Sequence, residues 1–383
     1  MWRHIAANAL TVFIVALIAV AGLVGWGQSQ YSGEGPLAEP ICLEVRPNMR
    51  MARLGDELAD RGAVSNARIF RLGAEYSGKA DDLKAGSFLV PEGASMEDIV
   101  DIVTRGGRST CGTEVVYRVG VTGQEIEVRE LDPTTNRFET ILEFDPEAGP
   151  AEGYGDVREK SDTRYRIALA EGATSWQIVE ALRKADFLTG EVEEVPAEGT
   201  LAPDSYEVRD GDDRGALLAD MEERQALRLA EAWANRDENL PIATPEEALI
   251  LASIIEKETG VPDERGTVAS VFVNRLNRGM RLQTDPTVIY GVTEGRGTLG
   301  RGLRQSELRA RTPWNTYVID GLPPTPIANP GLASIEAALN PEETDLVYFV
   351  ADGSGGHAFA RTLDEHNANV ARWREIEADR ETQ

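Results

Sequence analysis

The sequence predicts an α+β protein that begins with a transmembrane helix, and three observations lead to this prediction. Residues 1–30 contain an uncharged apolar run, residues 41–240 alternate short strand and helix patterns, and residues 243–383 open with an almost wholly apolar helix. A length of 383 residues gives room for two or three domains, and a hydrophobic content of 42% is ordinary for globular protein.

The charge balance restricts the partners of this chain. Sixty-five acidic residues against 39 basic residues give a formal net charge of −26. Such a surface repels nucleic-acid phosphates and anionic lipid, so no nucleic-acid partner is expected. It suits an exported, solvated domain.

The N-terminal apolar run spans Ile5–Trp26 and is long enough to cross a bilayer core of about 30 Å. Arg3 precedes it, whereas residues 27–45 carry three glutamates and no Lys or Arg. The positive-inside rule therefore places the remainder of the chain outside the cytoplasm. The alternative is a cleaved signal peptide, because Ala19-Val20-Ala21 resembles a small-residue cleavage site.

Cys42 and Cys111 flank the first apparent domain, as if tying its first strand to its last. Outside the cytoplasm such a pair can form a disulfide. Two buried free thiols are the alternative.

Residues 27–118 begin with a Gly/Ser/Pro-rich tether at 27–40, which leads into a first αβ subdomain at 41–118. Its first helix carries an apolar face formed by Met51, Leu54 and Leu58.

Residues 119–240 are predicted as a β-like insertion at 119–164, to which we assign no chemistry, and a second αβ subdomain at 165–240. The second subdomain ends in a linking helix, whose packing face is predicted to contain Leu217, Met221, Leu227 and Ala230.

The two subdomains share a repeated segment. "EGASMEDIVDIV" at 92–103 and "EGATSWQIVEAL" at 171–182 have the same Glu-Gly-Ala start, the same Ser/Thr position and the same apolar spacing. The opening "RPNMRMARLGDEL" is a looser third copy. A strand that leads through a Gly turn into a short capped helix resembles the LysM-like modules of cell-wall proteins. Plain αβ packing units are the alternative.

The segment "TPEEALILASIIEKETG" predicts a central buried helix. Thr244, Pro245 and Glu247 form its capped start, and Ala248–Ile255 are apolar or small without a break. Glu256 and Glu258 then end it, and their two-residue spacing turns them by roughly 200°, so they cannot act as one pair.

One of these two carboxylates is expected to line a cleft, while the other meets solvent or an arginine such as Arg265. Desolvation at the end of an apolar helix raises the pKa of a carboxyl group toward the range that a general acid needs. Two solvated glutamates in the last turn of the helix are the alternative reading.

The next segments continue this region. "DERGTVASVFVNRLNRG" predicts a helix capped by Asp263, with a buried stripe of Val268, Val271, Phe272 and Leu276. "MRLQTDPTVIYG" then offers hydroxyl, amide and aromatic groups of the kind that bind sugars, at Gln283, Thr284, Asp285, Thr287 and Tyr290. Asp285-Pro286 is predicted as a helix cap and first turn, and each of these residues has capping or packing as its alternative role.

The C-terminal residues are predicted to be scaffold. "LVYFVADGSGGHAFAR" indicates a hairpin, and Thr362 with Glu365 starts a terminal helix. His357 and His366 lack metal-ligand spacing, so a structural role is favoured over a metal site. The Gly-rich turn precedes a strand and therefore lacks the context of a phosphate loop.

Five segments in order resemble the YceG-like endolytic murein transglycosylases, the MltG family. They are "LASIIEKETG", "VASVFVNRL", "GMRLQTDPTVIYG", "PWNTYVIDGLPPTPIANPG" and "YFVADGSGGHAFARTLDEHN", and they cover nearly all of residues 246–369. One N-terminal membrane helix followed by LysM-like subdomains is also similar to that family. The stretch at 119–164 is longer than the family layout leads one to expect.

The resemblance implies a bacterial inner-membrane enzyme whose external C-terminal α+β catalytic domain, residues 243–383, cuts peptidoglycan strands between N-acetylmuramic acid and N-acetylglucosamine. It implies Glu256 as the catalytic residue and places Gln283, Thr284, Tyr290 and Asn315 along the substrate groove. Asp285 is expected to be a cap rather than a second acid. No cofactor is implied, and membrane-bound peptidoglycan synthases are expected partners only by this resemblance.

Three functional hypotheses follow from the sequence. The first is a membrane-anchored lytic transglycosylase that uses Glu256 and ends nascent glycan strands. The second is a cell-wall-binding scaffold without activity, and the third is a glycoside hydrolase that pairs Glu256 with Asp285 or another carboxylate. The sequence favours the first, because a binding module has no need for a glutamate that emerges from an apolar helix.

Overall fold

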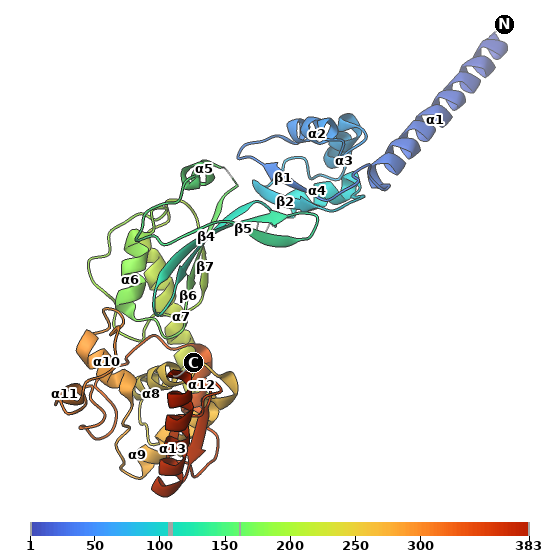
Figure 1. Ribbon diagram of the computed structural model, residues 1–383. Coiled ribbons are helices and arrows are strands. Elements are labelled where there is room, and N and C mark those ends of the chain that lie inside the picture. The colour runs from blue at the N-terminus through green and yellow to red at the C-terminus, as the bar shows by residue number, and fades with distance from the viewer. Residues whose placement is uncertain (1, 106–109, 161, 382–383) are drawn as a thin grey trace. The chain divides into compact units, whose positions relative to one another are not determined.

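The computed structural model describes residues 2–105, 110–160 and 162–381 (Figure 1). Met1, at the predicted cytoplasmic tip, and Thr382 and Gln383, at the predicted C-terminal end, lie outside these ranges. Helices combine with antiparallel strand pairs, and a run of helices follows β7, which confirms the α+β class.

The chain forms two compact units. Unit 1 comprises Met1–Val115, Glu127–Glu143 and Pro150–Arg164, and unit 2 comprises Val116–Ile126, Phe144–Gly149 and Tyr165–Gln383. The predicted boundary between residues 165–240 and 243–383 therefore falls inside unit 2.

The first helix, α1, spans Trp2–Ser32. Its part from Leu10 to Ser32 contains an 18-residue window with a mean hydropathy of 2.4 and no buried residue, so the helix is long and apolar enough to cross a membrane. It continues further than predicted, into the expected tether. Tyr31 packs its ring on Gly73, where it takes the space that a side chain would need.

Unit 1 contains the antiparallel pair of β1 (Ile41–Val45) and β2 (Gly86–Val90), with α2 (Met51–Asp60) and α3 (Ala67–Tyr76) between them in sequence. Helix α4 (Met96–Thr104) follows. These elements enclose one apolar core, which contains the predicted face of Met51, Leu54 and Leu58.

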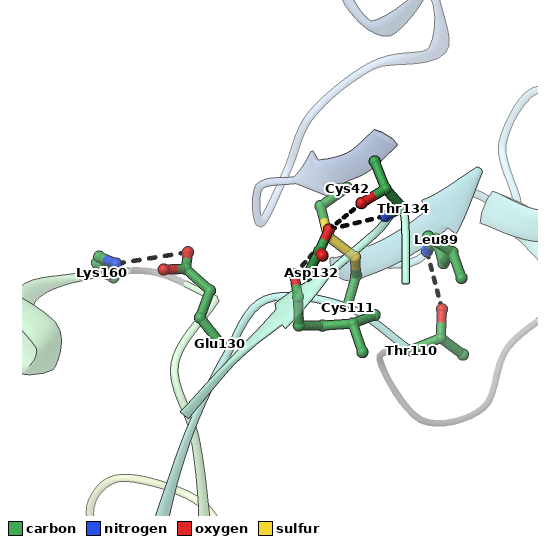
Figure 2. Close-up of a disulfide and its surroundings, with 9 residues drawn as sticks. Cys42, Leu89, Thr110, Cys111, Glu130, Asp132, Thr134 and Lys160 are labelled. Carbon is green, nitrogen blue, oxygen red and sulfur yellow. Dashed lines mark hydrogen bonds and ion pairs between the residues drawn. A yellow bond between two sulfur atoms is a disulfide. The ribbon is translucent and has the colours of Figure 1, made fainter. Parts of the chain in front are cut away.

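A disulfide between Cys42 and Cys111 closes this region (Figure 2). The two Cα atoms are 5.6 Å apart, which lies within the usual range for a disulfide. Close by, the backbone N–H of Leu89 donates to Oγ1 of Thr110 at 2.9 Å, which attaches the segment before Cys111 to β2. The predicted bridge is therefore present, and it joins β1 to the segment that precedes β3.

The five-stranded sheet has the order β5-β4-β3-β6-β7. Its strands are β3 (Thr113–Val119), β4 (Gln124–Asp132), β5 (Arg137–Phe144), β6 (Arg164–Leu169) and β7 (Ser205–Val208), and the short α5 (Tyr154–Glu159) lies between β5 and β6. The stretch predicted as a β-like insertion thus contributes two strands to a sheet that also contains the strands of the second predicted subdomain.

Both copies of the repeated segment form a strand, a Gly turn and a capped helix. In the first copy Ser95 caps α4 and forms a capping box with Asp98. In the second copy Thr174 caps α6 (Ser175–Lys184) and forms a capping box with Gln177. The turn glycines, Gly93 and Gly172, have φ of 67° and 80°. Whether these units are related to LysM modules stays a prediction.

The linking helix α7 spans Arg214–Ala234. Leu217 and Met221 are buried as predicted, but Leu227 is 64% exposed and Ala230 is exposed, so that half of the predicted face is wrong. The buried face of α7 differs from the prediction because the side chain of Gln225 is buried in place of that of Leu227. Its Nε2 donates to the carbonyl oxygens of Gly199 and Pro330, at 3.3 and 3.0 Å.

The C-terminal part of unit 2 packs around α8 (Pro245–Glu258), which contacts α7, α9, α10 and α12. The remaining elements are η1 (Pro262–Glu264), α9 (Arg265–Asn277), α10 (Asp285–Thr293), α11 (Gln305–Leu308), α12 (Leu332–Leu339), the hairpin of β8 (Tyr348–Ala351) and β9 (His357–Ala360), and α13 (Leu363–Glu381). The hairpin and the terminal helix agree with the predictions for these segments.

Two helix starts differ from the predictions. A 3-10 turn occupies Pro262–Glu264, so α9 begins at Arg265 and Glu264 takes the cap position expected for Asp263. Helix α10 begins at Asp285 itself, and Thr284 takes the cap position without a side-chain capping bond. In the second case the hydroxyl of Thr284 is engaged elsewhere, as described below.

Candidate active site

Helix α8 forms the centre of the candidate site. The hydroxyl of Thr244 accepts from the backbone N–H of Glu247 at 3.2 Å, and Pro245 stands at the first helical position, as predicted. All eight residues of Ala248–Ile255 are buried in one apolar core, whereas residues 256–258 are half-buried. The helix therefore carries three ionisable side chains from the core to the edge of the fold.

Glu256 meets the start of a second helix. Its Oε2 accepts a hydrogen bond of 3.0 Å from the backbone N–H of Gly331, the residue that caps α12. This contact holds the carboxyl group of Glu256 at the N-terminus of α12. In the part of the chain that the structure describes, no basic side chain forms an ion pair with Glu256.

Glu258 points to different partners. Thr284 donates its hydroxyl to Oε1 of Glu258. Burial raises the pKa of the Glu258 carboxyl, and the hydrogen bond from Thr284 opposes this shift. The negative charge of Asp285 adds to the increase, while His357 and Arg275 counteract it. The two glutamates thus face different surroundings, as the predicted rotation requires.

Lys257 fastens α8 to the second copy of the repeat. Its Nζ donates to the carbonyl oxygen of Gly172 at 3.2 Å. Burial lowers the pKa of Lys257, and the charges of Glu256 and Glu198 oppose that shift. Lys257 therefore acts as a link between helix and turn.

Glu198 forms a half-buried polar group beside this link. Its Oε1 accepts from the backbone N–H of Ser175 at 2.8 Å, and its Oε2 accepts from the hydroxyl of Tyr290 at 3.2 Å. Burial raises the pKa of the Glu198 carboxyl, and these hydrogen bonds counteract part of the increase. The segment around residues 172–198 is thereby attached to α10.

The predicted sugar-binding residues do not form one exposed strip. Gln283 is exposed, with φ of 51°, and Asp285 is exposed and accepts from the hydroxyl of Tyr317 at 2.7 Å. Thr284 and Thr287 are 2% and 0% exposed. Thr287 bonds the carbonyl oxygen of Thr284 at 2.7 Å, so its hydroxyl serves the fold.

Tyr290 and Asn315 are similarly engaged. The ring of Tyr290 packs on Trp314 at a centroid distance of 5.7 Å, and its hydroxyl bonds Glu198. Asn315 is fully buried, and its Nδ2 donates to the carbonyl oxygens of Glu307, Leu308 and Ala310. These contacts favour structural roles for both residues.

Arg265 does not pair with Glu258. Its charge instead acts on Glu171, and its Nε is buried without a hydrogen-bond partner among the described residues. The two histidines contact other parts of the fold: Nδ1 of His357 bonds Glu264 at 2.8 Å, and His366 stacks on Tyr348.

Glu171, Glu198 and Gly331 surround α8 but were not among the predicted site residues. Glu171 begins the second copy of the repeat, so the Glu-Gly-Ala motif marked its place without indicating proximity to Glu256. Gly331 ends the family segment "PWNTYVIDGLPPTPIANPG", which gave no indication that it contacts Glu256. Glu198 had no signal in the sequence, because its contacts arise only from the tertiary fold.

A cleft of about 900 Å³ lies elsewhere in unit 2. It contains none of the predicted site residues, because it is lined by residues 237–240 and 341–346 and by Ser270, Val273, Asn274 and Arg361. Its wall is mainly acidic and polar. We assign it no role in the chemistry of Glu256.

Fold and site together define a class of protein: an α+β chain with an N-terminal helix able to cross a membrane and a half-buried carboxylate at the end of a central buried helix. The profile of the YceG-like family matches residues 140–372, which is more than half of the chain. The chain therefore belongs to the YceG-like family.

Curated relatives carry one name. The chain is 37% identical over 172 residues to the endolytic murein transglycosylase of Bacillus subtilis, which covers 45% of this chain and 46% of that protein. It is 25% identical over 391 aligned positions to the endolytic murein transglycosylase of Streptococcus pneumoniae, with 96% of this chain and 65% of that protein covered. The chain thus spans 46% and 65% of the length of these two relatives, less than two thirds in each case.

A solved structure of a YceG-like protein from Listeria monocytogenes also matches. The alignment covers 86% of this chain and 98% of that chain, with 24% identity and a TM-score of 0.46.

Proposed function

We propose that this chain is a membrane-anchored lytic transglycosylase that cuts peptidoglycan glycan strands internally, with Glu256 as its acid and base. The observation that carries the proposal is the position of Glu256, half-buried at the end of the buried helix α8. Membership of the YceG-like family and the name shared by the relatives support the substrate class.

A lytic transglycosylase needs one carboxyl group. Glu256 protonates the oxygen that leaves the muramic acid, and the resulting carboxylate then takes the proton of the C6 hydroxyl of the same sugar. That oxygen closes on C1 to give a 1,6-anhydro end, and no water is consumed. One acid/base group contributes typically 10²- to 10⁴-fold to the rate, so sugar distortion and charge stabilisation supply the rest.

The other predicted residues take two roles in this proposal. Gln283 and Asp285 are exposed and able to contact glycan directly. Thr284, Tyr290 and Asn315 support the groove through their contacts with Glu258, Glu198 and the backbone.

The location follows from α1. We place this helix across the bacterial inner membrane as a single span, with the remainder of the chain outside the cytoplasm. This puts Glu256 where new glycan is made, so the expected outcome of cleavage is termination of nascent strands. Peptidoglycan synthases are the expected neighbours, and the αβ subdomains are expected to hold glycan in a LysM-like manner.

The test digests purified peptidoglycan with the full chain in detergent and identifies the released fragments by mass. We expect 1,6-anhydro ends from the wild type and none from Glu256→Gln. Glu246→Gln is the matched control, because it removes a charge from the exposed first turn of the same helix, and it should keep anhydro products. Reducing ends would instead indicate hydrolysis, and uncut glycan that stays bound would indicate a scaffold.

A further inference from the structure

We infer that Glu171 is a second substrate-facing carboxylate of the Glu256 site, which stabilises the positive charge that develops on the sugar during cleavage. The inference rests on the proposed function, because it names a second group for the same reaction. It assigns Glu171 no proton transfer and no covalent bond.

Gly331 brings the two carboxylates together. Its backbone N–H donates to Oε2 of Glu256 at 3.0 Å, and a Cβ built on its Cα would overlap Oε1 of Glu171. Since both groups surround one residue, standard backbone dimensions place the two carboxylates within roughly 7 Å of each other. A sugar ring that meets Glu256 therefore also comes within reach of Glu171.

The backbone next to Glu171 is fixed against the site. The N–H of Gly172 donates to the carbonyl oxygen of Asn329 at 2.9 Å, and the N–H of Asn329 donates back to Ala173 at 2.9 Å. Lys257 bonds the carbonyl oxygen of Gly172, and a Cβ on Gly172 would be 3.6 Å from Cγ of Glu256. The bonds to Asn329 and Lys257 thus hold the turn after Glu171 next to Glu256.

The electrostatics agree with this placement. Desolvation raises the pKa of the Glu171 carboxyl first, and the negative charge of Glu256 raises it further. The charges of Arg265 and Arg228 act in the opposite direction. The residue remains exposed, so its carboxylate is accessible to a bound polysaccharide. Asp285 is not placed to act together with Glu256. It accepts a hydrogen bond from Tyr317, and its charge acts on the carboxyl group of Glu258.

The chemistry requires such a charge. Cleavage of a glycosidic bond passes through a transition state that resembles an oxocarbenium ion, with positive charge at C1 and the ring oxygen. Fixed charges directed at developing charge lower the barrier without any proton exchange. Because Glu171 is exposed to solvent, we expect about a 10- to 100-fold effect on kcat, below the 10²- to 10³-fold typical of a fully enclosed group.

Glu171→Gln tests the inference in the full chain, with the rate of anhydro-end release from purified peptidoglycan as the readout. We expect kcat to fall by about 10- to 100-fold, with KM and Tm nearly unchanged, since the loss concerns only the transition state. Glu375→Gln is the control. Glu375 is exposed on α13, away from the Glu256 site and from the αβ subdomains, so the kcat of this variant should equal that of the wild type.

Gly331→Ala is a second, independent variant. Gly331 has φ of −71°, which alanine adopts without strain, and its N–H to Glu256 is retained. The added methyl group displaces the Glu171 carboxyl, which is the flexible end of its side chain. We therefore expect kcat to fall in the same direction as for Glu171→Gln.

The outcomes separate the inference from the proposed function. Wild-type kcat in both Glu171→Gln and Gly331→Ala, with Glu256→Gln inactive, would overturn the inference alone. A fall in activity that comes with a lower Tm, or wholly through KM, would also overturn it, because it would reveal a structural or binding role. Absence of anhydro ends from the wild type would overturn the proposed function instead.

Discussion

Asn315 uses its whole side chain inside the protein. Nδ2 donates to three carbonyl oxygens between residues 307 and 310, and Oδ1 accepts from the N–H of Tyr317 at 3.0 Å. The resemblance placed this residue along a groove, whereas its full burial makes it the support of the loop after α11. An amide was needed at this position to satisfy backbone groups on both sides.

Asn315→Ala should therefore destabilise unit 2. Truncation leaves buried backbone groups without partners, which costs about 1–3 kcal/mol, or roughly 2–4 °C in Tm for each kcal/mol. Asn235→Ala is the control, because that amide is exposed and donates only to the carbonyl oxygen of Glu231. Thermal unfolding of the two variants checks this, and equal Tm values would contradict it.

Glu198 predicts a pH effect on stability. Burial makes the pKa of this carboxyl higher in the folded chain than in the unfolded chain, so the folded state binds the proton more tightly. Its contribution to stability is present at low pH, and it is lost as pH rises from the unfolded value of about 4.3 through the raised folded value.

Glu198→Gln removes this titration and keeps an oxygen for the N–H of Ser175. We expect the stability of the wild type relative to the variant to increase as pH falls from 7 toward 4. Denaturant unfolding of both proteins at several pH values measures the difference. A gap that does not depend on pH would contradict the assigned burial of the charge.

Two helix caps allow the copies of the repeat to be compared. Ser95 Oγ accepts from the N–H of Asp98 at 3.0 Å and donates to its carboxylate. Thr174 caps α6 in the same way, but its hydroxyl also bonds the carbonyl oxygen of Gly295 at 2.6 Å. The second copy thus has a tertiary contact that the first lacks in this position.

Ser95→Ala should destabilise unit 1 by about 1 kcal/mol, the usual effect of losing a cap. Thr174→Ala should destabilise unit 2 by more, about 2–3 kcal/mol, since it also leaves the Gly295 carbonyl oxygen without this bond. Native-state hydrogen exchange resolves the two units. Equal losses in both variants would show that the bond to Gly295 contributes nothing.

Prediction from sequence succeeded where a local pattern determined the element. The capped start of α8, its run of buried residues, the hairpin of β8 and β9, and the capped helices of the repeat all follow from spacing and capping chemistry. The prediction failed for Leu227, because two carbonyl oxygens from distant loops recruit Gln225 into the interior and turn α7. It also missed the cap of α10, since Thr284 gives its hydroxyl to Glu258 rather than to its own helix.

For the candidate site, the apolar run predicted the last turn of α8, with Glu256 and Glu258 both open, and the family resemblance favoured Glu256; both signals come from contiguous residues. Glu171, Glu198 and Gly331 reach the same region from 85, 58 and 75 positions away along the chain. Only the tertiary structure brings such residues together, so no periodicity or motif predicts their proximity.

At the scale of the whole molecule, the disulfide is expected to stabilise unit 1 and not unit 2. Cys42 and Cys111 are 69 residues apart, and both belong to unit 1. In the chain-entropy account, a loop of this length contributes about 4 kcal/mol by restricting the unfolded state.

Replacement of both cysteines by alanine should lower the stability of unit 1 by about 2–5 kcal/mol and leave unit 2 nearly unchanged. Hydrogen exchange of the two units measures the difference. Tryptophan fluorescence is a second probe, because Trp176, Trp233, Trp314 and Trp373 all belong to unit 2. An equal loss in both units would mean that they unfold together.

The packing of Tyr31 on Gly73 of α3 affects how unit 1 moves relative to the membrane. A helix of 31 residues is about 46 Å long, which exceeds a hydrocarbon layer of about 30 Å, so its last turns project from the bilayer in the proposed topology. Because those turns pack on unit 1 instead of unravelling, that unit would share the tilt of its anchor and would swivel with it. Movement of the protein along a glycan strand would then depend on lateral diffusion and axial rotation of α1 in the membrane, rather than on a flexible linker.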